Sequence, residues 1–315
     1  MKSVVVYNTC GIKRDNTAWY IECIKSFLNQ DFDDYRVVLS SCLNSAECLQ
    51  EIYKTFRNEI SYSFHSEPHT VNITFNKALQ DFTSHFGDAE TYVYVDSGCT
   101  FDDQRDILSR LYETYKSGPN GIIALQCDTD EALQVLDPKF KYQTSDVQIK
   151  DEDYIIPIGK SINQHVHLFS NEIYKAYNNK IEPDVFAAYC SESTFNFLAA
   201  AVNQRWVIMK DIQIRHLKGV DGASNCKPHW SSVHRNPWNN LLCGRDANDF
   251  INDPEARRVG MGYEECNDIM NHNPDAYGPD GFPLFPEELK SMINKYFFLS
   301  KEELDYDKMK CKFIP

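Results

Sequence analysis

The sequence predicts an α/β protein whose mostly parallel sheet is covered by helices on both faces. Three observations lead to this fold class. Short apolar runs typical of buried strands alternate with segments whose apolar residues recur every three to four positions. The alternation begins almost at the N-terminus and continues to about residue 216. The composition, 42% hydrophobic and 25% charged over 315 residues, suits a chain that folds as one large domain or two.

The first three elements set the pattern for the rest of the chain. Residues 2–7 form a β-branched apolar run that ends at a set of turn-forming residues. Trp19, Cys23 and Phe27 then fall on one face of an amphipathic helix, and residues 35–39 form the next strand. This order of strand, helix and strand favours a parallel sheet.

The same alternation predicts the elements that follow. We expect helices at residues 45–56, 71–86, 104–115 and 191–202, and strands at residues 91–95, 122–126, 165–169, 206–209 and 212–216. Polar residues dominate residues 128–154, which predicts a loop-rich insertion or an antiparallel edge. The last third is rich in proline among aromatic and charged residues, so we place a domain boundary near Gly219, between residues 1–219 and a C-terminal subdomain of residues 220–315.

The charge balance argues against a nucleic-acid partner. The formal net charge is −14, from 46 acidic and 32 basic residues, so the summed field repels polyanions. A pocket for one nucleotide diphosphate stays compatible with this charge, because a metal ion and a few donors offset the phosphate charge locally.

The cysteines and the apolar runs predict a soluble, intracellular protein. Eleven cysteines are scattered without a Cys-x-x-Cys pair, and no signal sequence precedes the first strand. Both features favour reduced thiols and a cytoplasmic location. The longest apolar runs, such as residues 195–202, are far shorter than the roughly 20 residues of a membrane span, so we expect no transmembrane segment.

Polar residues follow several of the predicted strands. Ligands of parallel α/β sheets bind beyond the carboxyl ends of the strands, so loops at Asn8, Ser40 and Asp96 are expected to meet at one cleft. Asp96 ends an apolar strand, and the small Ser97 and Gly98 after it let a nucleotide and its metal approach the backbone. Asp96 is the first candidate site residue, although an Asp that caps a turn after a strand fits equally well.

Around Asp96 the sequence resembles the GT-A nucleotide-sugar glycosyltransferases, in particular the large inverting family 2, in which an apolar strand ends in an Asp-x-Asp motif. Val95-Asp96-Ser97-Gly98 matches the apolar approach and the first Asp of that motif. Residues 19–32, with a Cys-Ile-Lys-Ser run ahead of Gln30, resemble the family's first helix, and residues 72–78 lie where the family has a helix containing Asn. The resemblance covers roughly residues 2–219.

The resemblance implies an enzyme that transfers a sugar, with inversion, from a UDP- or GDP-linked donor to a hydroxyl of a glycan or other acceptor. It implies a divalent cofactor, Mn²⁺ or Mg²⁺, bound by Asp96 and His216, and a catalytic base at Glu192. It leaves residues 220–315 either to bind the acceptor or to pack on the core. The residues that it places at the nucleotide sugar are Asn8, Thr9, Ser41, Asn76, Lys77, Asp96, Ser97, Gly98 and Lys218.

One position departs from the family pattern, because Gly98 stands where the second Asp of the motif is expected. The metal would then be held by Asp96, the diphosphate, water and a distant ligand, or metal dependence would be weak. Plainer explanations also exist for the other candidates. Glu192 fits an acidic residue favoured by a helix dipole, His216 fits a residue that ends a strand, and Asn76 fits a polar helix face.

Other function classes fit parts of the sequence. Residues 96–100 are similar to the acidic-x-Gly-x-Gly loop of a methyltransferase, but the second Gly is absent and that loop usually follows the first strand. A non-catalytic nucleotide-sugar or carbohydrate-binding protein with the same fold is favoured by the missing second Asp. No Walker motif occurs, and a zinc site is disfavoured because the cysteines are not clustered. His165 and His167 fit one face of a strand.

Overall fold

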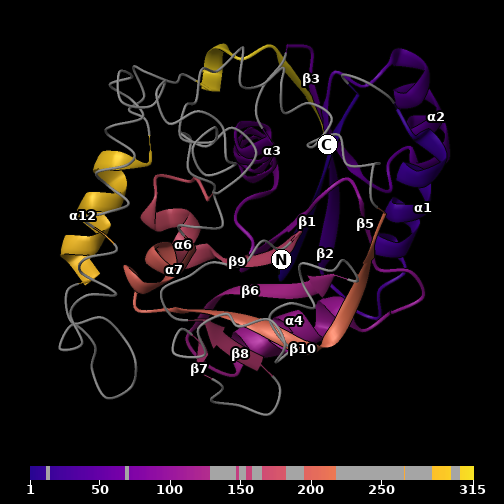
Figure 1. Cartoon of the computed structure of the whole chain (residues 1–315). Helices are drawn as coiled ribbons and strands as arrows, with labels where there is room; N and C mark the ends of the chain where they lie inside the picture. The colour runs from indigo at the N-terminus through magenta and orange to yellow at the C-terminus, as the bar shows by residue number, and fades with distance from the viewer. Residues whose placement is uncertain are drawn as a thin grey trace, which may run out of the picture.

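The computed structural model describes residues 1–11, 15–67, 71–127, 147–148, 154–157, 165–181, 195–217, 266, 286–298 and 306–315. They form one 11-stranded sheet with helices packed on both faces (Figure 1). The strand order is β11-β3-β2-β1-β4-β9-β6-β10-β8-β7, and β5 pairs with β10 off this path.

The bounds of the elements are as follows. The strands are β1 (Ser3–Cys10), β2 (Tyr35–Cys42), β3 (Ser61–His65), β4 (Thr91–Val95), β5 (Cys99–Thr100), β6 (Asn120–Cys127), β7 (Val147–Gln148), β8 (Tyr154–Pro157), β9 (Val166–Ser170), β10 (Arg205–His216) and β11 (Cys311–Ile314). The helices are α1 (Thr17–Leu28), α2 (Ala46–Phe56), α3 (Val71–Phe86), α4 (Ile107–Lys116), α6 (Asn171–Ala176), α7 (Phe195–Ala200) and α12 (Pro286–Tyr296), and Tyr306–Lys308 forms a 3₁₀ turn.

The N-terminal half of the sheet is parallel. Strands β3, β2, β1 and β4 run in one direction, with Asn8 opposite Ser40 and Tyr7 opposite Val95. The carboxyl ends of β1, β2 and β4 therefore lie at the same edge of the sheet. The segments at Asn8, Ser40 and Asp96, which were expected to meet at one cleft, are thus adjacent along this edge.

Strand β9 reverses the direction in the middle of the sheet. It pairs antiparallel with both β4 and β6, whereas β10 runs parallel to β6. Val166 lies opposite Val95, so the residue before β9, His165, lies beside the carboxyl end of β4. This register brings His165 to the edge where Asp96 is found.

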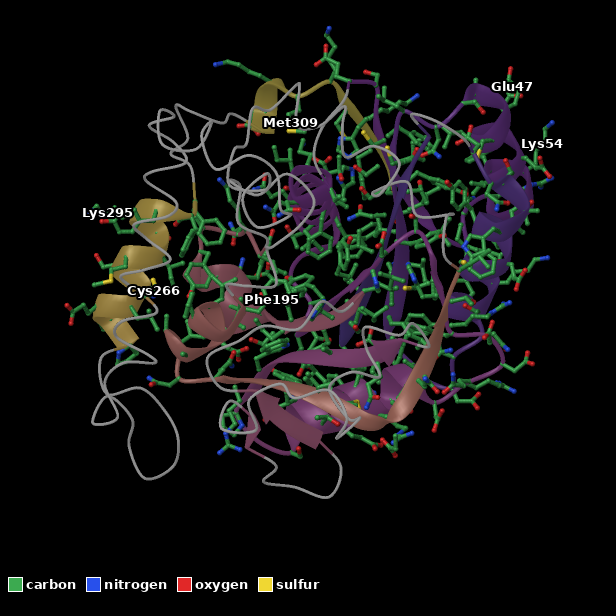
Figure 2. All side chains as sticks on the ribbon, viewed as in Figure 1. Glu47, Lys54, Phe195, Cys266, Lys295 and Met309 are labelled. Atoms are coloured by element: carbon green, nitrogen blue, oxygen red, sulfur yellow. The ribbon has the colours of Figure 1, made fainter. Side chains whose placement is uncertain are left out.

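Two apolar clusters, one on each face of the sheet, form the core. Alternate strand residues such as Val5 and Val93 pack with α1, α2 and α4, and the residues between them, such as Val6, pack with α3, α6, α7 and α12. Figure 2 shows Phe195 among the interior side chains, whereas Glu47 and Lys54 extend outward from α2. The structure thus confirms the predicted fold class, a mixed, mostly parallel sheet between two layers of helices.

Most of the predicted elements agree with the structure. The predicted helix at residues 71–86 and the strand at residues 91–95 coincide with α3 and β4. The two strands expected at residues 206–209 and 212–216 form one strand, β10, whose register against β6 shifts between Ile208 and Gln213. Within residues 128–154, for which a loop-rich insertion or an antiparallel edge was expected, β7 is described, and it pairs antiparallel with β8, which begins at Tyr154.

Several elements were not predicted from the sequence. Strand β3 was missed because Ser61, Ser63 and His65 interrupt its apolar pattern, although all three side chains are buried. In the C-terminal region, β11 pairs with β3, and α12 packs on α7. The described parts of residues 220–315 therefore pack on the same core, while the proposed boundary at Gly219 lies outside the described residues. Among the described helices, none combines the length and apolar character that a membrane crossing requires.

Candidate functional site

Asp96 lies in a buried turn at the carboxyl end of β4. Asp96 is only 7% exposed, and its backbone N–H donates to the carbonyl of His165 at 3.0 Å. One carboxylate oxygen, Oδ1, accepts the N–H of Ser97 at 2.7 Å, and the other, Oδ2, lies 3.1 Å from Nδ1 of His165. Asp96 therefore has one oxygen fixed by the turn and the other directed at an imidazole.

Two histidines complete the cluster. His165 immediately precedes β9, and His216 is the last residue of β10, where it pairs with Cys99 of β5. The two imidazole rings stack with their centroids 4.0 Å apart and their planes 8° from parallel. Three chain segments that are distant in sequence thus deliver one carboxylate and two imidazoles to one place.

The cluster is a candidate site for a single divalent ion. One ligand atom from each of Asp96, His165 and His216 lies within 4.8 Å of the others. Two ligands at right angles, each about 2.1 Å from an ion, are about 3.0 Å apart, which is close to the 3.1 Å between Asp96 and His165. These are the residues that would hold a metal, and two of them, Asp96 and His216, are the metal ligands expected from the sequence.

The charges of the cluster keep Asp96 ionised. Burial alone would raise the pKa of Asp96, but the hydrogen bond with His165 opposes burial. The positive charges of His165 and His216 and the N–H of Ser97 add to this effect, and together they lower the pKa below its ordinary value. By contrast, burial lowers the pKa of His167 to about 3, so this imidazole stays neutral against the ring of Phe195.

Two aromatic residues form hydrogen bonds to the turn that carries Asp96. The hydroxyl of Tyr7 and the indole N–H of Trp19 both donate to the carbonyl of Ser97, at 2.7 and 3.0 Å. Burial raises the pKa of Tyr7 well above its usual range, so its hydroxyl stays a donor. Neither residue was expected to support the site, because their apolar bodies read as core residues in the sequence.

Gly98 is required by the close approach of His216. A Cβ atom at position 98 would lie 2.6 Å from Nε2 and 2.7 Å from Cδ2 of the His216 ring. The residue that departs from the Asp-x-Asp pattern is therefore the one over which the candidate metal ligand lies. An Asp at this position would occupy the space of the imidazole.

Replacing Gly98 by Ala is expected to weaken metal binding while leaving the fold intact. The added methyl displaces the end of the His216 side chain rather than backbone, so we expect metal affinity to fall about tenfold to 100-fold. The free energy of unfolding of the metal-free protein should change by less than about 1 kcal/mol. Calorimetric titration with Mn²⁺ and denaturant unfolding measure the two quantities.

Gly118→Ala is the matched control, because the nearest atom to a Cβ there is 3.6 Å away. It should leave metal affinity unchanged. Equal metal affinity in the Gly98→Ala variant and the control would contradict the placement of His216 in the site.

Arg215 ties the strand of His216 to helix α1. Its guanidinium forms a bidentate pair with Asp102, with contacts of 2.6 and 3.1 Å, and donates to Glu22 at 2.6 Å. It also lies over the ring of Trp19, 5.0 Å from the centroid. Because the side chains of successive strand residues point to opposite faces, Arg215 faces α1 while His216 faces Gly98.

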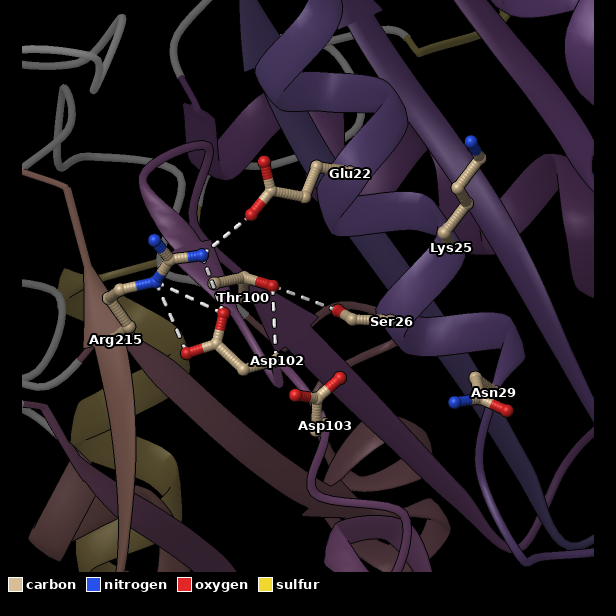
Figure 3. Close-up of a pocket in the computed structure, with 8 residues that line it drawn as sticks. All are labelled: Glu22, Lys25, Ser26, Asn29, Thr100, Asp102, Asp103 and Arg215. Carbon is tan, nitrogen blue, oxygen red and sulfur yellow. Dashed lines mark hydrogen bonds and ion pairs between the residues drawn. The ribbon is translucent and has the colours of Figure 1, made fainter.

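An open pocket of about 680 Å³ lies on the α1 side of β5 (Figure 3). Figure 3 shows Arg215 directed at Asp102 and Glu22 on its wall, with Thr100 bonded to Ser26 behind them. None of the residues that line this pocket was predicted to contact the nucleotide sugar or the metal. The pocket is therefore next to the candidate site but is not formed by its ligands.

Asn8, Thr9 and Ser41 lie at the carboxyl ends of β1 and β2, as expected. The hydroxyls of Thr9 and Ser41 both donate to Oδ1 of Asn44, at 2.9 and 2.8 Å, and the amide of Asn44 donates to Asp15 at 2.7 Å. Asn44 and Asp15 were not identified from the sequence, since a loop residue gives no periodic signal.

Asn8 is different from its neighbours. It is 3% exposed, and neither its amide nitrogen nor its amide oxygen has a hydrogen-bond partner within the described parts of the chain. Leaving a buried amide unpaired is costly, typically about 1 to 3 kcal/mol. Because Tyr7 lies opposite Val95, Asn8 is beside Asp96, where a polar ligand would satisfy its amide.

Asn76 and Lys77 lie in α3 and have other partners. The side-chain oxygen of Asn76, which is fully buried, accepts the N–H of Ile181 at 3.0 Å. Lys77 forms an ion pair with Asp81, one turn along the helix, at 2.5 Å. The remaining two predicted residues, Glu192 and Lys218, lie outside the described residues.

His165 is the site residue that the sequence did not identify as a ligand. It was recognised only as one of two histidines on a strand face. The antiparallel register of β9 against β4 is what places it beside Asp96. An Asp followed much later by a His just ahead of a strand is the only signal in the sequence, and it has no fixed spacing.

The sequence matches no protein-family model and no curated protein. Among solved structures, it is similar to the mannosyltransferase PcManGT from Pyrobaculum calidifontis, in complex with GDP-Man and Mn²⁺, with 12% identity, a TM-score of 0.53, and coverage of 92% of this chain and 73% of that chain. S. aureus TarS is also found, with 14% identity and a TM-score of 0.49 over 88% of this chain and 45% of that chain. TarS 1-349 in complex with UDP gives 12% identity and a TM-score of 0.49 over 85% and 81%. At such low identity the similarity to the mannosyltransferase shows a shared fold, and the predicted GT-A fold class is confirmed.

Proposed function

We propose that this chain is a glycosyltransferase that moves a sugar from a nucleotide-diphosphate sugar to an acceptor hydroxyl, with metal assistance and inversion. The observation that carries the proposal is the cluster of Asp96, His165 and His216 at the carboxyl edge of the sheet. Support comes from the shared fold with a mannosyltransferase that binds GDP-Man and Mn²⁺. The donor of this chain is a UDP- or GDP-linked sugar, and the acceptor is a glycan or another hydroxyl compound.

The proposed donor site extends from the metal ligands along the edge of the sheet. A divalent ion, Mn²⁺ or Mg²⁺, would supply Lewis-acid stabilisation of the departing diphosphate. Asn8 would bind the donor with its buried amide, and Thr9 and Ser41 would face it through the network of Asn44. Ser97 and Gly98 would contact the donor from the Asp96 turn, where the absence of a side chain on Gly98 leaves room for the His216 imidazole.

The remaining predicted contacts are part of the same proposal. Lys218 is two residues after His216, the last residue of β10, and its ammonium group would pair with phosphate. Asn76 and Lys77 would contribute from the first turns of α3, after exchanging their present partners. Residues 220–315 would form a C-terminal subdomain that contributes to the acceptor site.

The reaction is a single displacement. Glu192 would take the proton from the acceptor hydroxyl while the oxygen of that hydroxyl forms a bond to the anomeric carbon. The bond from the anomeric carbon to the diphosphate breaks at the same time, and the diphosphate leaves with the electron pair. Attack from the face opposite the leaving group inverts the anomeric configuration.

A screen of the purified, metal-free chain against UDP- and GDP-sugars tests the proposal. A donor that binds the native state at 100 times its Kd stabilises it by about 2.7 kcal/mol, which raises Tm. We expect such a shift for one donor with Mn²⁺ present and a smaller one without it. The same donor should be slowly hydrolysed when no acceptor is added. Binding without turnover at any metal concentration would favour a non-catalytic binding protein, and no binding of any donor would overturn the proposal.

A further inference from the structure

The candidate metal site differs in chemistry from a pair of carboxylates. Its ligand atoms are one carboxylate oxygen and two imidazole nitrogens, and they lie within 4.8 Å of one another. The position at which a second carboxylate would be expected, Gly98, has no side chain and is covered by the His216 ring. Nitrogen has therefore taken the place of oxygen at this site.

Both imidazoles are built into the fold rather than placed on a loose surface. His216 is 8% exposed, and the N–H of the following residue, Leu217, donates to the carbonyl of Gly98 at 2.9 Å. His165 is fixed by its backbone carbonyl, which accepts the N–H of Asp96 at 3.0 Å. The two rings also hold each other through their stacked contact of 4.0 Å. The spacing of the three ligands is thus set by strands β4, β9 and β10.

The class of metal follows from these ligands. Mg²⁺ prefers oxygen ligands and gives up its bound water reluctantly. Imidazole suits the first-row transition metals, for which ligand affinity rises from Mn²⁺ to Co²⁺. A site with two imidazoles and one carboxylate offers Mg²⁺ only one good protein ligand. It offers a transition metal three.

We propose that the Asp96, His165 and His216 site selects a divalent transition metal and discriminates against Mg²⁺, with His165 supplying the ligand that Gly98 cannot. This inference rests on the proposed function only for the role that the bound metal plays in sugar transfer. The metal preference itself is a property of the chain and is measured without any donor.

Direct titration of the metal-free full-length chain with Co²⁺ is the first test, because the visible spectrum of Co²⁺ reports ligation by histidine. We expect one Co²⁺ per chain and d–d bands that a 100-fold excess of Mg²⁺ does not remove, while Mn²⁺ competes at a moderate excess. Removal of the bands by Mg²⁺ at concentrations equal to those of Mn²⁺ would overturn the inference.

A charge-altering substitution at the new ligand makes the test specific. His165→Asp replaces nitrogen by oxygen, so we expect at least a tenfold loss of Co²⁺ affinity and a gain in Mg²⁺ affinity relative to Co²⁺. His85→Gln is the matched control, because His85 is an exposed histidine of α3 whose ring faces Phe313. The control should retain the Co²⁺ spectrum and affinity.

The variants are first compared with the wild-type chain by circular dichroism. If His165→Asp does not fold, His165→Asn, which keeps a neutral side chain beside Asp96, is used instead. An unchanged Co²⁺ spectrum and affinity in the folded variant would overturn the role of His165.

The inference and the proposed function fail in different ways. Selective Co²⁺ binding without turnover of any donor would overturn the enzyme and leave the metal preference standing. Donor turnover supported equally by Mg²⁺ and Mn²⁺, with equal affinities for the two ions, would leave the enzyme standing and overturn the metal preference.

Discussion

Asp96→Asn is expected to lower the rate of sugar transfer by roughly 1,000-fold and to weaken metal binding by roughly 100-fold or more. Asn has the same size as Asp, and its amide oxygen still accepts the N–H of Ser97, so the turn should keep its shape. What is lost is the negative charge beside the two stacked imidazoles. Without that charge, an ion bound at the site would have only neutral ligands.

The measurement is a pair of titrations followed by an assay. Mn²⁺ affinity and donor affinity are obtained by calorimetry, and transfer or donor hydrolysis is followed at saturating metal. Asp88→Asn is the matched control, because Asp88 is an exposed carboxylate near the amino end of β4, where it pairs with Lys175 at the surface. Exposed pairs contribute about 0 to 1 kcal/mol, so this control should fold and react normally. Metal-dependent transfer that survives in Asp96→Asn would remove Asp96 from the centre of the site.

Asp96 was predicted from a local signal in the sequence, whereas His216 was expected as a metal ligand from the resemblance to the glycosyltransferase family. Asp96 follows an uninterrupted apolar strand, and His216 ends the last strand of the alternating pattern. Their proximity has a physical cause that local patterns do not contain: β5 folds back from the Asp96 turn and pairs with β10, which places His216 over Gly98. Each residue could therefore be identified as a candidate from the sequence, whereas the contact between them depended on strand pairing.

His165 shows why the site could not be completed from the sequence. Nothing in the residues around it indicates that β9 runs antiparallel between β4 and β6. If β9 were parallel to β4, its first residue would lie at the opposite edge of the sheet, far from Asp96. The departure at Gly98 pointed to a missing ligand, and the fold supplies a candidate from a strand of reversed direction.

Asn76 is a residue that the sequence singled out and whose side chain is bonded within the protein. Its position in the sequence favoured a donor contact, and that role stays a prediction. In the structure its side chain is fully buried and joins α3 to the segment after α6 through Ile181. Asn8, from the first strand, is the amide that lies buried without a partner in the described regions. The core pattern of a strand or helix identifies its inward face, but it does not tell whether an inward amide bonds to the protein or to a ligand.

The start of α7 lies against the strand that follows His165. Phe195, the first residue of α7, packs edge-on against the ring of His167, with the centroids 4.8 Å apart. His167 is two residues from His165, about 7 Å along an extended strand. The start of α7 is thus packed against the strand that follows His165, while Glu192 itself lies outside the described residues and stays the predicted catalytic base.

Glu192→Gln is therefore expected to lower transfer by about 100-fold to 10,000-fold while donor and metal affinities stay within a factor of about two. The amide keeps the size of the carboxylate but cannot accept the proton of the acceptor hydroxyl. Binding of the donor, which does not require that proton transfer, should be unaffected. Calorimetry with the donor and a transfer assay on the same preparation separate the two effects.

Glu172→Gln distinguishes catalysis from a plain effect on helix stability. Glu172 is an exposed acidic residue in the first turn of α6, so its carboxylate also interacts favourably with a helix N-terminus. Losing that interaction costs about 0.3 to 1 kcal/mol of stability and should not change transfer. If Glu192 only favoured the start of a helix, its Gln variant would show the same small loss of stability and normal transfer, and the assignment of the base would fail. A large loss of transfer at unchanged stability has no such explanation, because a helix-dipole interaction contributes to folding and not to the removal of a proton from the acceptor.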